Sequence, residues 1–104
     1  MDHFSQLEIL SLAANKISQI KGLDNLCNLN QLLLNENFIE KIENLGNLGN
    51  LELLDLSDNK VVHLENLADL QNLEELWLTA NKVESFQELQ HLASLPSLQT
   101  VTPS

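Results

Sequence analysis

Apolar residues recur along the chain at a fixed spacing. The string Leu-x-x-Leu-x-Leu-x-x-Asn begins at Leu7, Leu29, Leu51 and Leu73, so each copy starts 22 residues after the one before it. Further apolar side chains stand at the eleventh, fourteenth, seventeenth and twentieth positions counted from each starting leucine. All seven apolar positions are filled in all four copies, which predicts a stack of four similar structural units.

The first part of each unit predicts a short β-strand, because the leucines at the fourth and sixth positions alternate with other side chains. One unit cannot bury its apolar side alone, so neighbouring units are expected to stack over one continuous core beneath a parallel sheet. A 22-residue period with this string is the signature of a leucine-rich repeat solenoid, an α/β fold whose short strands line a concave face. The predicted strands are Ile9–Ser11, Gln31–Leu33, Leu53–Asp55 and Glu75–Trp77.

The segments that return to the next strand are expected on the convex side. Their three apolar sites are three residues apart, which favours 3₁₀ or irregular turns. The last return differs, because residues 84–95 contain no Gly or Asn and Ser85 is followed three residues later by Glu88. This capping-box pattern predicts one late helix, which Pro96 ends before a fifth strand starts at Leu98.

The repeats predict a single domain over residues 1–104, with repeats at about 7–28, 29–50, 51–72 and 73–97 and a partial fifth at 98–104. Terminal repeats of a solenoid normally carry a polar cap over the end of the core. Neither end of this sequence has an evident cap, so we expect a fragment of a longer array. The alternative is that a partner or a second copy covers the ends, which would allow self-association.

The asparagine that closes each string is expected to have a structural role. It stands where the chain leaves the strand and turns, and where backbone groups that face the interior lack a partner in the sheet. A side-chain amide supplies both a donor and an acceptor to such groups. The four asparagines are Asn15, Asn37, Asn59 and Asn81.

The charge of the chain limits its partners. Five Lys+Arg stand against 15 Asp+Glu, for a formal net charge of −10. Nucleic acid is excluded as an expected partner because a phosphate backbone requires clustered cations, and an anionic membrane surface is disfavoured for the same reason. The single cysteine, Cys27, has no intrachain partner for a disulfide, which favours a reducing compartment, the cytoplasm or the nucleus.

No catalytic, metal-binding or cofactor-binding motif assembles in the sequence. The only glycines are Gly22, Gly46 and Gly49, so there is no phosphate-binding loop. The three histidines have no Cys, His or Asp partner at ligand spacing. We therefore expect no cofactor and no metal, and an enzyme is the least favoured class of function.

The outward-facing strand positions are expected to bind a protein partner, because the curvature of a solenoid makes them an extended surface. Carboxylates gather there beside Trp77, the only tryptophan, and no cation is present. A tryptophan within an acidic rim is typical of a hot spot for a basic protein surface, the alternative being that Trp77 packs flat across Asp55 and Thr79. The predicted contacts are Glu75, Trp77, Asp55, Asp58, Glu36, Leu33 and Leu53.

Residues 29–48 resemble the 22-residue subclass of leucine-rich repeats, typified by the regulatory subunit of type-1 protein phosphatase. Residues 73–89 are similar to the late repeats of that family, in which an acidic residue and a tryptophan on the concave strand contact the phosphatase. Glu75 and Trp77 occupy the matching positions, and Asp55 matches another acidic contact. The resemblance implies a phosphatase regulator whose partner is the catalytic subunit of type-1 protein phosphatase.

The same unit also resembles the light chain of outer-arm axonemal dynein. The late repeats of that protein carry a similar Glu-Leu-Trp string and a Leu-Pro turn comparable to Leu95 and Pro96. This second resemblance implies a scaffold or light-chain-like component of an axonemal or cytoskeletal complex, which stays open beside the first hypothesis.

Overall fold

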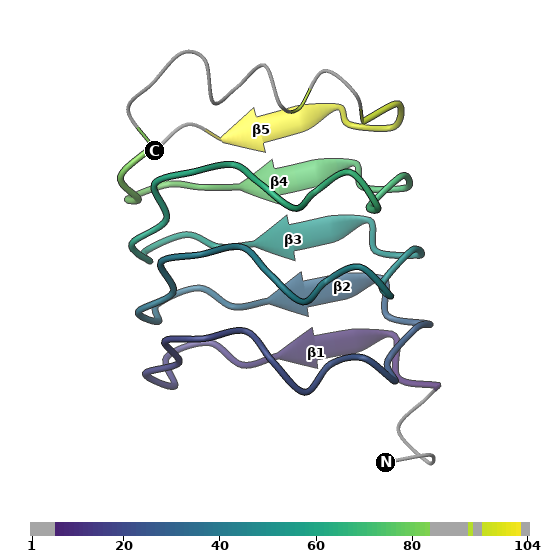
Figure 1. The fold of residues 1–104 in the computed structure, drawn as a ribbon, viewed down its shortest axis with the longest axis horizontal. Coiled ribbons are helices and arrows are strands. Elements are labelled where there is room, and N and C mark those ends of the chain that lie inside the picture. The colour runs from purple at the N-terminus through teal and green to yellow at the C-terminus, as the bar shows by residue number, and fades with distance from the viewer. Residues whose placement is uncertain (1–5, 84–91, 93–94, 103–104) are drawn as a thin grey trace.

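A computed structural model describes residues 6–83, 92 and 95–102. These residues form one parallel sheet of five strands in the order β1-β2-β3-β4-β5 (Figure 1). Each strand pairs with the equivalent residues of the next unit, as Leu10 does with Leu32, so the 22-residue period is the register of the sheet. The strands are β1 (Ile9–Ser11), β2 (Gln31–Leu33), β3 (Leu53–Asp55), β4 (Glu75–Trp77) and β5 (Thr100–Thr102).

The first four strands lie where the sequence predicts them, and the predicted parallel sheet is confirmed. The fifth strand begins at Thr100, two residues after the expected start at Leu98. Leu98 is the first-position leucine of its unit, equivalent to Leu73, and in each unit the strand starts at the third position. Leu98 instead packs against the core.

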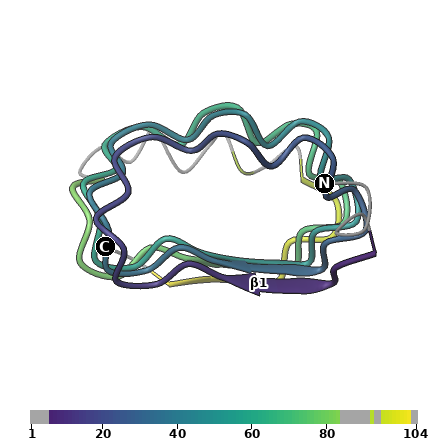
Figure 2. The ribbon, with the colours of Figure 1, turned by 90° about the horizontal axis from the view of Figure 1, so that it is seen from below.

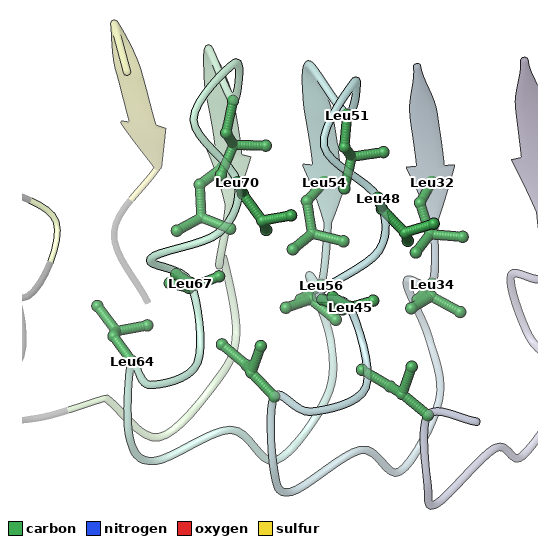
Figure 3. Packing of buried hydrophobic residues seen from close by; sticks show 14 of the residues in the cluster. Leu32, Leu34, Leu45, Leu48, Leu51, Leu54, Leu56, Leu64, Leu67 and Leu70 are labelled. Atoms are coloured by element: carbon green, nitrogen blue, oxygen red, sulfur yellow. The ribbon is translucent and has the colours of Figure 1, made fainter. Parts of the chain in front are cut away.

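The core lies inside the stack. Seen along the sheet, successive units overlie one another as flattened loops, with the strands on one side and the return segments on the other (Figure 2). Leu54 of β3 and Leu48 of a return segment are both buried. Figure 3 shows their side chains in the same interior as those of Leu45 and Leu56, so both sides of each loop contribute to one apolar core.

The return segments turn by short-range backbone hydrogen bonds. The Leu26 N–H donates to the Leu23 carbonyl at 3.0 Å, and the Leu29 N–H donates to the Leu26 carbonyl at 3.1 Å. Equivalent pairs recur in the next two units, and the three-residue reach of these bonds is that of a 3₁₀ turn. The helix that the capping box at Ser85 and Glu88 predicts falls on residues 84–91 and 93–94, outside the described residues.

The asparagines that close the strings form a ladder, as predicted. Asn59 Nδ2 donates to the Leu56 carbonyl of its own turn at 3.0 Å and to the Leu34 carbonyl of the preceding unit at 2.9 Å. Its Oδ1 accepts the Ile39 N–H at 3.0 Å. Asn37 makes the equivalent bonds one unit earlier, so each amide joins its own turn to its neighbour's.

Two further asparagine ladders, which the repeat pattern does not predict, run along the return segments. Asn44 Nδ2 donates to the Ile20 carbonyl at 2.6 Å, and Asn66 Nδ2 donates to the Ile42 carbonyl at 2.7 Å. Both asparagines have left-handed backbone, and Gly22 occupies the equivalent position with φ 79°. Gly and Asn tolerate this conformation best, which explains why the first three units carry only these two residue types there.

The third ladder lies just before the strands. Asn50 Nδ2 donates to the Cys27 carbonyl at 3.2 Å, and Asn72 Nδ2 donates to the Gly49 carbonyl at 2.9 Å. Together the three ladders give a structural reason for most of the 13 asparagines in the chain. Repeated amide side chains satisfy backbone carbonyls that short strands and tight turns leave without a sheet partner.

Candidate protein-binding surface

The predicted contacts on the strands lie side by side on one face. We call the outward-facing residues of β1 to β5 the sheet face. The register pairs Leu33 with Asp55 and Asp55 with Trp77, so these three side chains form one row across adjacent strands. Leu53 and Glu75 pair in the row beside it. Since side chains two residues apart share a face of a strand, both rows belong to the same surface.

Trp77 is held by a neighbour on its own strand. Its Nε1–H donates to Glu75 Oε1 at 3.3 Å, and both side chains are partly buried. The hydrogen bond fixes the direction of the indole along β4 and leaves part of the ring exposed. Partial burial of Trp77 is compatible with both alternatives that the sequence left open, a hot spot for a partner and local packing.

Asp55 lies deeper than a strand pattern suggests. It is only 7% exposed, between Leu33 and Trp77 in its row. Its Oδ1 accepts the Ser57 N–H at 2.9 Å, an Asx-type bond that stabilises the turn after β3. Asp55 thus has a structural role. Its contact with a partner stays a prediction, and only a small part of the residue is exposed for such a contact.

Glu36 and Asp58 extend the acidic surface beyond the strands. Both are exposed and occupy the eighth position of their units, with φ 58°. The Glu36 N–H donates to the Ser57 carbonyl at 2.9 Å, and the Asp58 N–H donates to the Thr79 carbonyl at 2.7 Å. These bonds hold the two turns one strand apart, a spacing of about 5 Å, so their carboxylates add to the same negative field.

Three exposed apolar residues are missing from the predicted contacts. Ile9 on β1 is 56% exposed, Phe38 is 47% exposed and Val62 is 41% exposed. Ile9 belongs to the sheet face, on a strand that pairs with β2 alone among the described strands. Phe38 and Val62 lie outside the strands. Phe38 could have been noticed in the sequence, because the other three units carry lysine at the same position.

Within residues 6–83, 92 and 95–102, no group of three or more His, Cys, Asp or Glu side chains is arranged to hold a metal ion. Cys27 is exposed, and its Sγ–H donates to the Asn25 carbonyl at 3.7 Å. An open hollow lies at the first unit, lined by residues that include Leu12, Asn15 and Ile20.

In the part of the chain that the structure describes, no helix has the length and apolar character needed to cross a bilayer.

The repeated strand, turn and asparagine ladder define a class of protein. Residues 49–91 match the family described as Leucine Rich repeats (2 copies), and the fold of the chain is the leucine-rich repeat fold. No curated protein matches the chain.

Solved structures of leucine-rich repeat proteins are similar to this chain. Internalin C2 from Listeria monocytogenes superposes with a TM-score of 0.82 at 35% identity, over 93% of this chain and 42% of its own. A chain of the Drosophila melanogaster SNF/U2A′ complex superposes with a TM-score of 0.82 at 30% identity, over 89% of this chain and 55% of its own. A chain of a TLR13–ssRNA13 complex superposes with a TM-score of 0.84 at 28% identity, over 97% of this chain and 16% of its own. The chain thus spans no more than 55% of any of these three chains.

Proposed function

We propose that the chain is a non-catalytic protein-interaction module whose sheet face binds a protein partner. The observation that carries the proposal is the Trp77 indole, held by Glu75 with part of its ring exposed. Trp77 stands on a face that bears carboxylates, and none of the outward-facing residues of β1 to β5 is Lys or Arg. Such a face suits a basic partner surface.

The physical argument rests on what a tryptophan contributes to an interface. A rigid aromatic anchor near the centre of an interface often provides much of the binding free energy, and an indole also attracts Lys or Arg through its ring face. The exposed carboxylates Glu36 and Asp58 would speed the approach of a basic partner more than they would add to final affinity. We therefore propose that Trp77 anchors the partner and that the carboxylates steer the partner's approach.

The partner we propose is the catalytic subunit of type-1 protein phosphatase, with the chain as part of a regulatory subunit. The support is the resemblance of the fourth unit, in which Glu75 and Trp77 occupy the positions that contact the phosphatase in that family. The structurally similar SNF/U2A′ chain comes from a complex, which is consistent with a protein partner. A scaffold in an axonemal or cytoskeletal complex is the second candidate, supported by the Glu-Leu-Trp string and the Leu-Pro turn.

The test is calorimetric titration of the purified phosphatase catalytic subunit with wild type and Trp77→Ala. We expect Trp77→Ala to weaken binding by at least about 2 kcal/mol, the size of a hot spot, with little effect on the fold. Val62→Ala is the matched control, because it removes an exposed apolar side chain that lies outside the sheet face. Equal affinities for wild type and Trp77→Ala would contradict the proposal.

A second comparison separates the two roles of Glu75. Glu75→Gln removes the charge but keeps an oxygen that can accept the indole N–H, whereas Glu75→Ala removes both. If orientation of the indole matters most, Glu75→Gln should bind nearly as well as wild type and Glu75→Ala should bind more weakly. A pull-down read by mass spectrometry then distinguishes the partners, and recovery of tubulin or dynein heavy chain without phosphatase would favour the second candidate.

A further inference from the structure

A second column of side chains runs along the edge of the solenoid, where the chain leaves the strands. It consists of the residues that follow the ladder asparagines, Lys16, Phe38, Lys60 and Lys82, and we call it the lysine–phenylalanine column. A backbone ladder keeps it in register, because each of the last three N–H groups donates to a carbonyl of the preceding unit at 2.8 to 2.9 Å. Adjacent members are therefore about 5 Å apart along the stack.

The cations of the chain gather at this edge. Three of the five lysines, Lys16, Lys60 and Lys82, belong to this column, whereas the outward-facing residues of β1 to β5 include none. Lys16 and Lys60 are exposed on either side of Phe38. In a chain with a net charge of −10, this edge and the acidic sheet face are therefore electrostatically different surfaces.

Phe38 is exposed although the fold does not require an apolar residue at its position. Lysine occupies the same position in the other three units, so a charged side chain fits there. The Phe38 ring is 47% exposed even though the Lys60 ammonium lies over it, with Nζ 5.2 Å from the ring centroid. Val62, two residues after Lys60, is another exposed apolar side chain on this edge. An apolar surface flanked by cations is the pattern of a binding site rather than of a purely solvated edge.

We propose that the lysine–phenylalanine column binds an acidic peptide segment that carries an apolar side chain. Phe38 contacts the apolar side chain, while Lys16 and Lys60 pair with carboxylates on either side of it. The segment is independent of the partner on the sheet face, since the two surfaces share no residue and only the column contributes lysines.

A peptide fits this edge better than a nucleic acid does. Binding to a phosphate backbone gains affinity from each neutralised phosphate, so it requires many clustered cations and little opposing charge. Glu40 is exposed two residues after Phe38, and it would repel an unbroken polyanion. A segment whose carboxylates are interrupted by an apolar residue places its charges beside the lysines and its apolar group at the ring.

The experiment measures binding of two fluorescein-labelled acidic peptides by anisotropy, one with a central Leu-Phe pair and one with Ser-Ser there. We expect wild type to prefer the Leu-Phe peptide, and Phe38→Ser to weaken its binding by about tenfold and to abolish the preference. Lys60→Gln should weaken the binding of both peptides and reduce the dependence of that binding on salt concentration. Ile9→Ser is the matched control, because it removes an exposed apolar side chain from the other surface and should change nothing.

Thermal unfolding of each variant checks that the fold is retained, which is expected because the Phe38 side chain lies outside the buried core. Equal binding of the two peptides, or unchanged binding by Phe38→Ser, would overturn the proposal. Tighter binding of polyuridylate than of the Leu-Phe peptide would overturn it as well. Trp77→Ala, which tests the sheet face, should bind the peptides as wild type does, so the two proposals stand or fail separately.

Discussion

The first and third units have the same consensus string but different surroundings. Leu10 of the first unit is only partly buried, whereas its equivalent Leu54 in the third unit is 0% exposed. Among the described strands, β1 pairs on one side only, and β3 pairs on both. The apolar pattern therefore specifies which side chains face inward, but a neighbouring unit on each side determines how completely they are buried.

The ladder asparagines show the same difference. Asn59 is buried and bonds to both its own turn and the preceding unit. Asn15 is exposed, and its Nδ2 donates to the Ala13 carbonyl within its own turn. The backbone differs too, since Lys16 has a left-handed φ of 60° and its equivalent Lys60 does not. A repeat thus acquires the full set of ladder contacts only when a unit precedes it.

The largest expected effect comes from removing a core leucine. Leu54→Ala creates a cavity in a fully packed site, and we expect it to lower the free energy of unfolding by about 3 to 4 kcal/mol. Leu10→Ala should lower it by about half as much, because its side chain is already partly hydrated. Urea denaturation followed by circular dichroism measures both. Equal losses would mean that the first unit is as well packed as the third.

The ladder should give the next largest difference. Asn59→Ala leaves the Ile39 N–H without its acceptor, and it removes one of the two amide donors from each of the Leu34 and Leu56 carbonyls. The usual loss for a buried group left unpaired is about 1 to 3 kcal/mol. Asn15→Ala removes one exposed bond and should change the free energy of unfolding by less than about 0.5 kcal/mol. A large loss for Asn15→Ala in the same denaturation assay would show that its amide has a further partner.

The strands and the core could be predicted because they depend only on spacing. Period two determines which side of a strand a leucine faces, and the 22-residue period sets the register, so residues such as Leu54 are assigned without any structure. The fifth strand was placed two residues too early, although the same rule applies to it, because a strand that starts at the third position counted from Leu98 starts at Thr100.

The depth of the site residues could not be predicted in this way. Alternation places Asp55 on the outer face, but it does not reveal that Leu33 and Trp77 flank it or that Ser57 binds its carboxylate. The hydrogen bonds of Asn44 and its equivalents could not be predicted either, because they depend on left-handed backbone and on a carbonyl in another unit. Such features follow from three-dimensional neighbours rather than from the pattern of residues.

The last comparison concerns the backbone after the ladder asparagine, where φ is positive at Lys16 but not at Lys60. Lys16→Gly should raise the free energy of unfolding by about 1 kcal/mol, because glycine adopts a left-handed conformation without the steric cost that lysine has. Lys60→Gly should lower it by about the same amount, because the unfolded chain gains freedom and the contact over Phe38 is lost. Thermal unfolding resolves opposite shifts of this size. Destabilisation by both variants would indicate that the turn of the first unit matches that of the third, and that the two units differ only in burial.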